Sequence, residues 1–508
     1  MPGSRSPDVL LLMTDQQRVG CTAAQGGPDT MPRTDALLAA GTRFERAYTS
    51  SPVCVPARTS LLTGRFPTAH RVRQNSTARH ASFGTDLLDV LRDAGYSLHF
   101  SGKPHMHPGP DDFDSYSGPF FHDSGPSAGP DASPGASATP IPSDRSDPPA
   151  PPDRDPAAFE QWLRELDHGV ADVPTPFALE DQFPVRIVDG ALQALDTAPA
   201  DRPQFTWVSF PEPHNPYQVP EPYFSMFEDQ IPERATDASV LDGMDWRFRW
   251  LHRLIEEKRP GFDRQWRRYR ANYLGMLRLI DDQIGRLLDA IAEGGRETII
   301  VVLSDHGDFV GEYGLQRKGA AMPDALMRIP LGFSGPGIVP QVREELVSII
   351  DIMPTLAERL TGAIPDGVQG RSLDPLLRGE KVPEEEFGSI LGELGYGGVS
   401  YEETDRPPLH FSYEGAGFDE LNSVTLGGEM RMLVHGHHKL VVDDHGHDTL
   451  HDLTADPLEI HDLSEDPEHQ EIRSDLHRRL VRWMMRAADD LPAGAYTPRT
   501  RPHNWRWA

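Results

Sequence analysis

The pattern Cys54-x-Pro56-x-Arg58 is the part of the sequence whose residue types point most directly to chemistry. Pro56 fixes its own φ and disfavours a helical Val55, so we expect an extended chain through Cys54 and a helix over residues 57–62. The helix N-terminus would place free N–H groups beside the thiol, and Arg58 would add a planar set of donors. The segment therefore predicts an oxyanion site next to a reactive side chain. A buried, inert thiol is the alternative for Cys54.

Further polar residues follow runs that read as strands. Residues 8–13 form a mainly apolar run that leads to Asp15, and residues 298–304 form another that leads to Asp305 and His306. Such runs are typical of a parallel sheet buried on both faces, and the carboxyl ends of its strands face the ligand crevice. The carboxylates and the imidazole are therefore placed where a metal ion could bind. Capping of the following turn is the alternative for Asp15.

The Cys54-x-Pro56-x-Arg58 pattern, together with residues 60–65 after it, resembles the signature of the type I sulfatases. The resemblance implies that Cys54 is converted after translation to formylglycine, an aldehyde whose hydrate is the nucleophile. It also implies a formylglycine-generating enzyme as a partner during maturation.

The same resemblance implies a site for one divalent cation. Its expected ligands are Asp15, Gln16, Cys54, Asp305 and His306. The pairs Asp15-Gln16 and Asp305-His306 are similar to those of the choline-sulfatase and phosphonate-monoester-hydrolase branch. Because oxygen ligands dominate, we expect Ca²⁺, with Mn²⁺ or Mg²⁺ as alternatives, and the imidazole favours Mn²⁺ more than an all-oxygen site would.

Five other residues are implied to act on the substrate. Lys103-x-His105 resembles the family pair in which the lysine holds sulfate and the histidine helps to break down the covalent intermediate. His214 resembles the histidine that contacts the leaving-group oxygen, and Lys318 resembles the lysine that bridges sulfate and leaving group. Asn75 stands where the same branch has a substrate-pocket asparagine, with a surface turn as its alternative.

These roles combine into an expected mechanism. The hydrated residue 54 would attack sulfur, while Arg58, Lys103 and Lys318 neutralise the charge of the sulfate group. His214 or Lys318 would protonate the departing alcohol. His105 would then remove the proton of the second hydroxyl, so that sulfate leaves and the aldehyde forms again.

Other polar residues are interpreted without a catalytic role. Glu212 either orients the His214 imidazole or is a solvated loop carboxylate, and the second is expected. Asp308 is expected to belong to the scaffold. The histidines between positions 435 and 447 are expected to lie on a surface hairpin, because no cysteine accompanies them as a metal ligand.

Apolar runs of strand length alternate with helical patterns over most of the chain, which indicates an α/β fold. The expected strands are 8–13, 44–48, 96–100, 204–210 and 298–304, and the expected helices are 34–41, 86–95 and 267–291. The resemblance implies a large mixed, mainly parallel sheet sandwiched by helices, as in alkaline phosphatase, with a smaller C-terminal α+β domain that carries an antiparallel sheet.

We predict an N-terminal α/β catalytic domain at residues 1–374 and a C-terminal subdomain at residues 375–508 with a small antiparallel sheet and a terminal helix. Residues 108–156 are rich in Pro, Ser, Asp, Gly and Ala and cannot bury enough apolar surface to form a core. This low-complexity insertion either covers the pocket and restricts substrates or is a solvated segment without a role, and the second is expected.

The composition is that of an ordinary soluble enzyme, with 508 residues, 38% of them hydrophobic, and a formal charge of −29. This charge argues against binding to nucleic acid or to an anionic membrane. Cys21 and Cys54 are the only cysteines, so there is no disulfide framework. No apolar run approaches the roughly 20 residues that span a bilayer. The short segment before residue 8 leaves no room for a signal peptide, so we expect a cytoplasmic protein.

The sequence therefore predicts a sulfatase that hydrolyses a small sulfate monoester to an alcohol and inorganic sulfate. The nearest alternative is a phosphonate monoester or phosphodiester hydrolase with the same nucleophile and metal, against which Lys103 and His105 argue. A remote alternative is an inactive homologue that binds sulfated ligands. The sequence does not specify the alcohol, and a homo-oligomer stays open.

Overall fold

The structure, a computed structural model, describes residues 6–120, 154–166, 169–319, 321–395, 400–406, 411–413, 416–418 and 428–489. The predicted insertion at 108–156 lies outside the described residues except at its two ends. Within the described ranges no helix is both long and apolar enough to cross a membrane.

The centre of the molecule is an eight-stranded mixed sheet in the order β5-β4-β6-β1-β7-β8-β2-β9. Its strands are β1 (Asp8–Asp15), β2 (Thr42–Phe44), β4 (Ser97–Gly102), β5 (Ser115–Ser117), β6 (Gln204–Pro213), β7 (Thr298–Ser304), β8 (Leu331–Ser334) and β9 (Gln341–Arg343). Every neighbouring pair is parallel except the two that include β8. The predicted large, mainly parallel sheet is therefore confirmed.

The inner strands are buried on both faces, as their apolar sequences predict. In β1, Leu11 belongs to one hydrophobic core and Leu10 to a second core on the opposite face. The strands β6 and β7 flank β1 in parallel register, so the carboxyl ends of all three meet at one edge of the sheet. β7 has the predicted bounds, whereas β1, β4 and β6 continue two or three residues further toward that edge.

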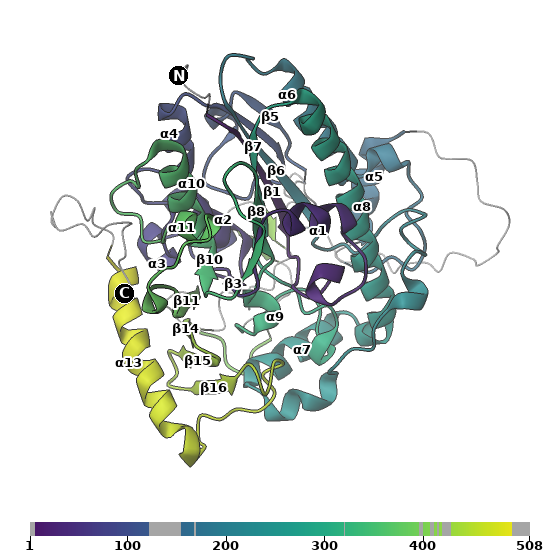
Figure 1. Ribbon diagram of the computed structural model, residues 1–508. Helices are drawn as coiled ribbons and strands as arrows, with labels where there is room; N and C mark the ends of the chain where they lie inside the picture. The colour runs from purple at the N-terminus through teal and green to yellow at the C-terminus, as the bar shows by residue number, and fades with distance from the viewer. Residues whose placement is uncertain are drawn as a thin grey trace.

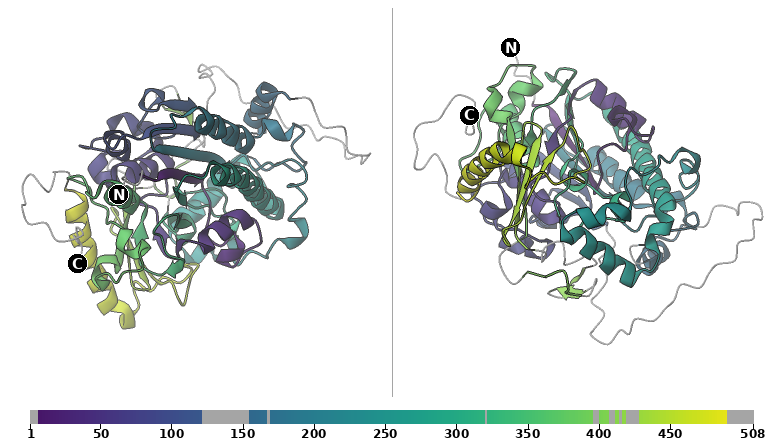
Figure 2. Two further views of the ribbon diagram at one scale, coloured as in Figure 1. Left: turned by 45° about the horizontal axis from the view of Figure 1, so that its top comes forward. Right: turned by 90° about the horizontal axis from the view of Figure 1, so that it is seen from below.

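Helices cover both faces of this sheet (Figures 1 and 2). One face carries α2 (Cys54–Thr63), α4 (Leu87–Asp93), α10 (Ile352–Thr361) and α11 (Asp374–Leu377). The other face carries α1 (Pro32–Ala39), α5 (Pro156–Leu166), α6 (Phe183–Thr197) and the long α8 (Trp266–Gly294). This part also includes the short helices α3 (Pro67–His70) and α9 (Asp324–Met327). Two further strand pairs are β3 (Ala47–Tyr48) with β10 (Val347–Ser348) and β12 (Phe411–Tyr413) with β13 (Ala416–Phe418). The predicted helix-covered sheet is thus observed.

The start of α2 differs from the expectation. Cys54 is the first residue of the helix, and the extended conformation ends at Val53, which is the N-cap. Pro56 lies in the first turn, where the backbone N–H that proline lacks has no partner within the helix, so the ring is tolerated. The thiol is therefore carried by the helix N-terminus itself rather than by the preceding extended segment.

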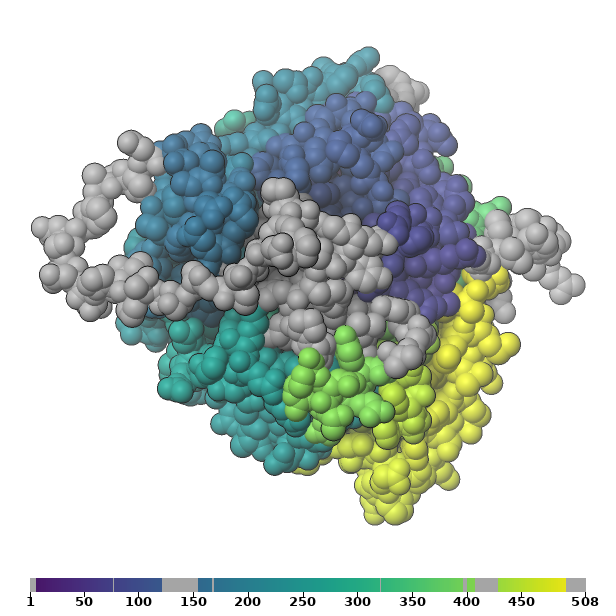
Figure 3. Space-filling view, turned by 180° about the vertical axis from the view of Figure 1, so that it is seen from behind, coloured from purple at the N-terminus to yellow at the C-terminus, as the bar shows by residue number. Residues whose placement is uncertain are grey.

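A second sheet and a terminal helix occupy one end of the molecule. The antiparallel strands β11 (Ser389–Leu394), β14 (Met430–His435), β15 (His438–Asp443) and β16 (Asp448–Asp452) lie beside α13 (Gln470–Ala487). In Figure 3 the yellow-green and yellow residues beyond about residue 430 border the teal part of the chain, which includes α7 (Trp246–Lys258). Arg247 of α7 pairs with Asp443 of β15 at 2.8 Å, and both side chains are buried. The antiparallel sheet predicted for the C-terminal region is confirmed.

Candidate active site

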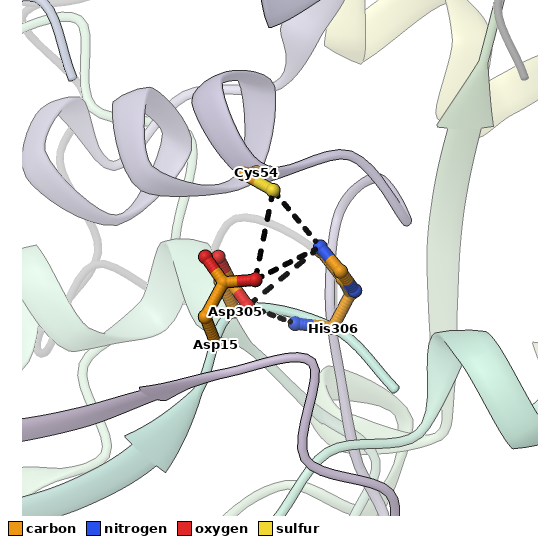
Figure 4. A group of neighbouring side chains, drawn as sticks. All are labelled: Asp15, Cys54, Asp305 and His306. Atoms are coloured by element: carbon orange, nitrogen blue, oxygen red, sulfur yellow. Dashed lines mark hydrogen bonds and ion pairs between the residues drawn. The ribbon is translucent and has the colours of Figure 1, made fainter. Parts of the chain in front are cut away.

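Cys54 lies at the carboxyl edge of the main sheet, where α2 points its N-terminus at the ends of β1 and β7 (Figure 4). The side chain is fully buried, and burial raises the pKa of the thiol. Asn75 accepts a hydrogen bond from the Val55 N–H at 2.9 Å. The predicted pocket asparagine therefore caps the helix that carries Cys54.

Four ligand-type side chains converge at this point. One ligand atom from each of Asp15, Cys54, Asp305 and His306 lies within 4.8 Å of the others, and all four residues are buried. The Cys54 Sγ is 3.2 Å from His306 Nε2 and 3.8 Å from Asp15 Oδ1. β1 and β7 are parallel neighbours, and this pairing brings Asp15 next to Asp305 despite their separation in the sequence. Among the described His, Cys, Asp and Glu residues, this is the one group so arranged, and the histidines near 435–447 form none.

Gln16 joins this group through its side-chain amide. Its Oε1 is 3.4 Å from Lys318 Nζ, which in turn is 3.3 Å from Cys54 Sγ and 3.5 Å from His306 Nε2. Its backbone adopts φ 69°, a left-handed conformation that is uncommon for a residue with a side chain. The Gln16 N–H donates to Asp305 Oδ1 at 3.0 Å, which fixes the turn after β1.

The donor set suits a hard divalent cation. Two carboxylates and an amide oxygen are the ligands that Ca²⁺, Mg²⁺ and Mn²⁺ prefer, and an imidazole is compatible with Mn²⁺. Separations below 5 Å fit atoms that each lie about 2.0–2.6 Å from one shared ion. The His306 Nδ1 is 3.0 Å from the Gly307 carbonyl, so it carries the proton and Nε2 offers its lone pair to the site. The residues present therefore fit a cation.

Cationic side chains balance the carboxylates. Arg58 spans both of them, with Nε 2.9 Å from Asp305 Oδ2 and Nη2 2.9 Å from Asp15 Oδ2. Lys103 Nζ is 3.0 Å from Asp15 Oδ2. Burial alone would raise the pKa of Asp15, but Lys103 and Arg58 hold that pKa well below its usual range. The Asp15 carboxyl is therefore ionised and ready to bind a metal.

Two histidines line the same region in their neutral forms. Burial lowers the pKa of His105 and of His214, and the nearby charge of Lys103 lowers each further. His214 Nδ1 lies 2.8 Å from the Asn215 carbonyl, so its proton is on Nδ1 and Nε2 is an acceptor. A neutral imidazole in such a place can take up or relay a proton during a reaction. The structure thus brings every predicted site residue to one edge of the sheet.

Sequence reasoning missed the environment of Glu212 and Asp308. Glu212 is not a solvated loop residue: it lies at the end of β6, is 2% exposed, and neither carboxylate oxygen has a hydrogen-bond partner among the residues that the structure describes. Asp308 contacts Gln16 directly, and Tyr217 and Tyr269 surround it. The role of Tyr269 could not be predicted, because the helical pattern of residues 267–291 already accounts for it as a core residue. For Asp308, the only signal in the sequence was its position among the polar residues that follow β7.

The geometry defines a class of enzyme. Residue 54, at a helix N-terminus, meets a set of potential metal ligands and three cationic side chains at the carboxyl edge of a mainly parallel sheet. Such an arrangement suits the hydrolysis of a negatively charged ester. The Sulfatase family model matches residues 7–363, and the chain belongs to this family. The predicted family, within the alkaline phosphatase superfamily, and the predicted sulfuric ester hydrolase are thereby confirmed.

Known proteins resemble the chain over most of its length. The uncharacterized sulfatase YidJ of Escherichia coli (strain K12) is 29% identical, with 99% of this chain and 91% of YidJ covered. The choline-sulfatase of Rhizobium meliloti (strain 1021) is 28% identical, with 95% and 88% covered. The phosphonate monoester hydrolase SpPMH from Silicibacter pomeroyi has the same fold, with a TM-score of 0.72, 22% identity, and 95% and 96% covered.

Proposed function

We propose that this sulfatase hydrolyses a small sulfate monoester through a formylglycine derived from Cys54, with one divalent cation bound by Asp15, Gln16, Asp305 and His306 and by residue 54 itself. The observation that carries the proposal is the position of Cys54. Its Sγ lies between Lys318 Nζ, at 3.3 Å, and His306 Nε2, at 3.2 Å, on a buried helix N-terminus. An ordinary buried cysteine does not have a cation and an imidazole nitrogen both in contact with its sulfur.

The cation would supply a positive charge that orients the nucleophile and one sulfate oxygen. Ca²⁺ is the ion that we propose, with Mn²⁺ or Mg²⁺ as alternatives, because oxygen donors outnumber the single imidazole nitrogen. Arg58 already contacts both Asp15 and Asp305, so it holds the two ligands and places a positive charge beside them.

The chain's own residues then divide the proton transfers. We assign protonation of the departing alcohol to Lys318, or to His214 once its Nε2 has taken up the proton that the attacking hydroxyl of residue 54 loses, and removal of the proton from the second hydroxyl of residue 54 to His105. Loss of that proton breaks the bond between residue 54 and the sulfate oxygen, so inorganic sulfate leaves and the aldehyde forms again. Lys103, with Lys318, would hold the sulfate, and Asn75 would contribute to the substrate pocket beside residue 54.

The first test is the mass of the tryptic peptide that spans residues 47–58, from protein made with and without a formylglycine-generating enzyme. Conversion of the thiol to an aldehyde lowers the mass by about 18 Da and removes the site of thiol alkylation. A peptide that keeps its mass and its alkylation beside a competent modifying enzyme would contradict the proposed nucleophile.

The phosphonate alternative needs a separate comparison. The modified protein should be offered an aryl sulfate and an aryl phosphonate monoester under the same conditions, and kcat/KM compared. We expect the sulfate to be preferred, because Lys103 and His105 both lie at the site. A clear preference for the phosphonate would make the alternative correct. Tight binding of a sulfated ligand without release of sulfate would instead support an inactive homologue.

Other parts of the proposal concern the setting of the enzyme. We propose a small sulfated compound as the substrate and a formylglycine-generating enzyme as the partner in maturation. A cytoplasmic location and the lack of binding to nucleic acid stay predictions from the sequence, and the sequence does not specify whether the protein is a homo-oligomer.

A further inference from the structure

The side chain of Gln16 lies between two groups of opposite hydrogen-bonding character. On one side its Nε2 is 2.5 Å from Asp308 Oδ2 and 3.3 Å from the Tyr217 hydroxyl. On the other side its Oε1 is 3.4 Å from Lys318 Nζ. Gln16 and Lys318 are both buried, so water cannot replace either contact easily.

This arrangement permits a single orientation of the amide. A carboxylate only accepts hydrogen bonds and an ammonium only donates them, so the amide NH₂ must face Asp308 and the carbonyl must face Lys318. A rotation of the amide by half a turn would set oxygen against carboxylate and NH₂ against ammonium. The carbonyl oxygen is thereby presented to the side where Cys54, His306 and the two carboxylates converge.

Asp308 is itself held firmly. Its Oδ1 accepts from the Val310 N–H at 2.7 Å and from the Tyr269 hydroxyl, and its Oδ2 accepts from the Tyr217 hydroxyl at 2.9 Å. The carboxylate, the two phenols and Gln16 are all buried. Tyr269 comes from α8 and Tyr217 from the loop after β6, so three separate parts of the chain fix the position of one carboxylate.

We propose that Asp308 is a positioning residue: it orients the Gln16 amide so that the carbonyl oxygen, and not the NH₂, faces the cation site. The inference rests on the cation site of the proposed function. A neutral amide has no charge to guide it toward a cation, and an incorrectly rotated amide would direct hydrogen atoms at the ion. The anion behind it supplies the missing direction.

A merely structural Asp308 would have a different signature. It would stabilise the turn after β7, and its loss would lower the stability of the whole region without any particular dependence on Gln16. A positioning residue acts only through the group that it positions. Coupling between Asp308 and Gln16 in cation affinity therefore separates the two roles.

The test is a double-mutant cycle on the full-length protein with residue 54 in one fixed maturation state. The dissociation constant of Mn²⁺, counted as free ion by electron paramagnetic resonance, is measured for the wild type, Asp308→Asn, Gln16→Ala and the double variant. We expect Asp308→Asn to weaken binding by about 10- to 100-fold, the size typical of partners that orient ligands. In the Gln16→Ala background the same change should have almost no effect.

Tyr269→Phe is the matched control. It removes one hydrogen bond from Asp308, together with the contacts of the Tyr269 hydroxyl to the Tyr217 hydroxyl and the Arg317 N–H, but leaves the contact between Asp308 and Gln16 in place. If loosening of the carboxylate were the cause, this variant would weaken Mn²⁺ binding as much as Asp308→Asn does. We expect a change of less than about threefold, since the contact between Asp308 and Gln16 is kept.

A reversal of polarity gives a second, independent readout. Gln16→Glu alone sets two carboxylates against each other, whereas Gln16→Glu with Asp308→Asn restores one donor and one acceptor at the same place. The double variant should bind Mn²⁺ more tightly than either single variant. Additive losses in both experiments would overturn the inference while leaving the proposed sulfatase function of the wild type untouched. A wild type that binds no Mn²⁺, Ca²⁺ or Mg²⁺ would overturn the cation site and the inference together.

Discussion

Replacement of Glu212 by Gln should remove a loss of stability that the wild-type protein undergoes as pH rises. Glu212 is 2% exposed, neither of its carboxylate oxygens has a hydrogen-bond partner within the described part of the chain, and burial raises its pKa to about 8. In the unfolded chain the same carboxyl has an ordinary pKa near 4.5. Between these values the folded protein keeps a proton that the unfolded chain releases.

The sign and size of the effect follow from this difference. Because the unfolded state binds fewer protons, the free energy of unfolding falls as pH rises through this window. The contribution is complete below the unfolded pKa and is lost as pH passes the folded one. Each pH unit costs about 1.4 kcal/mol, so the whole window amounts to about 5 kcal/mol, of which about 3 kcal/mol falls between about pH 5.5 and pH 7.5.

The assay is urea unfolding of the wild type and Glu212→Gln at those two pH values, after removal of metal by a chelator. Several buried histidines with lowered pKa values favour the folded state as pH rises, so the wild-type slope alone is a mixture. The difference between the two proteins cancels their effect. We expect the stability of the variant relative to the wild type to rise by about 3 kcal/mol between about pH 5.5 and pH 7.5.

Glu465→Gln is the control, since the Glu465 side chain is 91% exposed and should show no change of this kind with pH. If the difference between wild type and Glu212→Gln were the same at both pH values, Glu212 would have to be ionised in the folded protein throughout. The unpartnered carboxyl would then have a compensating partner, and the reasoning from its burial would be wrong.

Three further predictions concern the site. Arg58→Ala should lower the free energy of unfolding, measured by urea denaturation, by about 3–5 kcal/mol, because Asp15 and Asp305 would be left as buried, adjacent charges. Arg58→Lys should recover only part of this loss, since a lysine cannot span both carboxylates. Chelation of the cation should lower the melting temperature, and adding the cation back at about 100 times its dissociation constant should restore about 2.7 kcal/mol of the free energy of unfolding. An unchanged melting temperature on chelation would argue against a bound ion. Asn75→Ala should lower the free energy of unfolding by about 1 kcal/mol, the usual value of a lost helix cap, because the Val55 N–H loses its acceptor. Unchanged stability would mean that a water molecule accepts this hydrogen bond in place of Asn75.

Much of the fold could be predicted from the sequence because its signals are local. Continuous apolar runs identify β1, β6 and β7, and a parallel arrangement then requires that the residues after them meet at one edge. Asp15, Asp305 and His306 were assigned to one site on that basis together with the family signature. The start of α2 was placed too late because the backbone rule for the residue before proline yielded to the packing of a fully buried helix.

The surroundings of the site residues could not be predicted in the same way. The contact between Gln16 and Asp308 joins residues 292 positions apart, and the contact between Asp308 and Tyr269 depends on how α8 lies against the sheet. Tyrosines in a helical stripe have the same pattern whether their hydroxyls are idle or bonded. The burial of Glu212 was missed for a related reason, since β6 continues through prolines that read as a loop.

The balance of charge at the site explains both how an acidic protein can bind sulfate and where its selectivity has to arise. Arg58, Lys103 and Lys318 oppose the carboxylates of Asp15 and Asp305, so these five side chains together carry a surplus of one positive charge, although the chain as a whole carries −29. The Asp308 carboxylate lies behind Gln16 and is not one of the five. A divalent cation enlarges that surplus, which favours the negative charge that develops on a transferring sulfuryl group. A sulfate monoester and a phosphonate monoester each bring one negative charge, so the surplus attracts both equally. Discrimination must therefore come from directional contacts to the transferred group and its leaving oxygen, which is why the choice of substrate is tested by turnover and not by affinity.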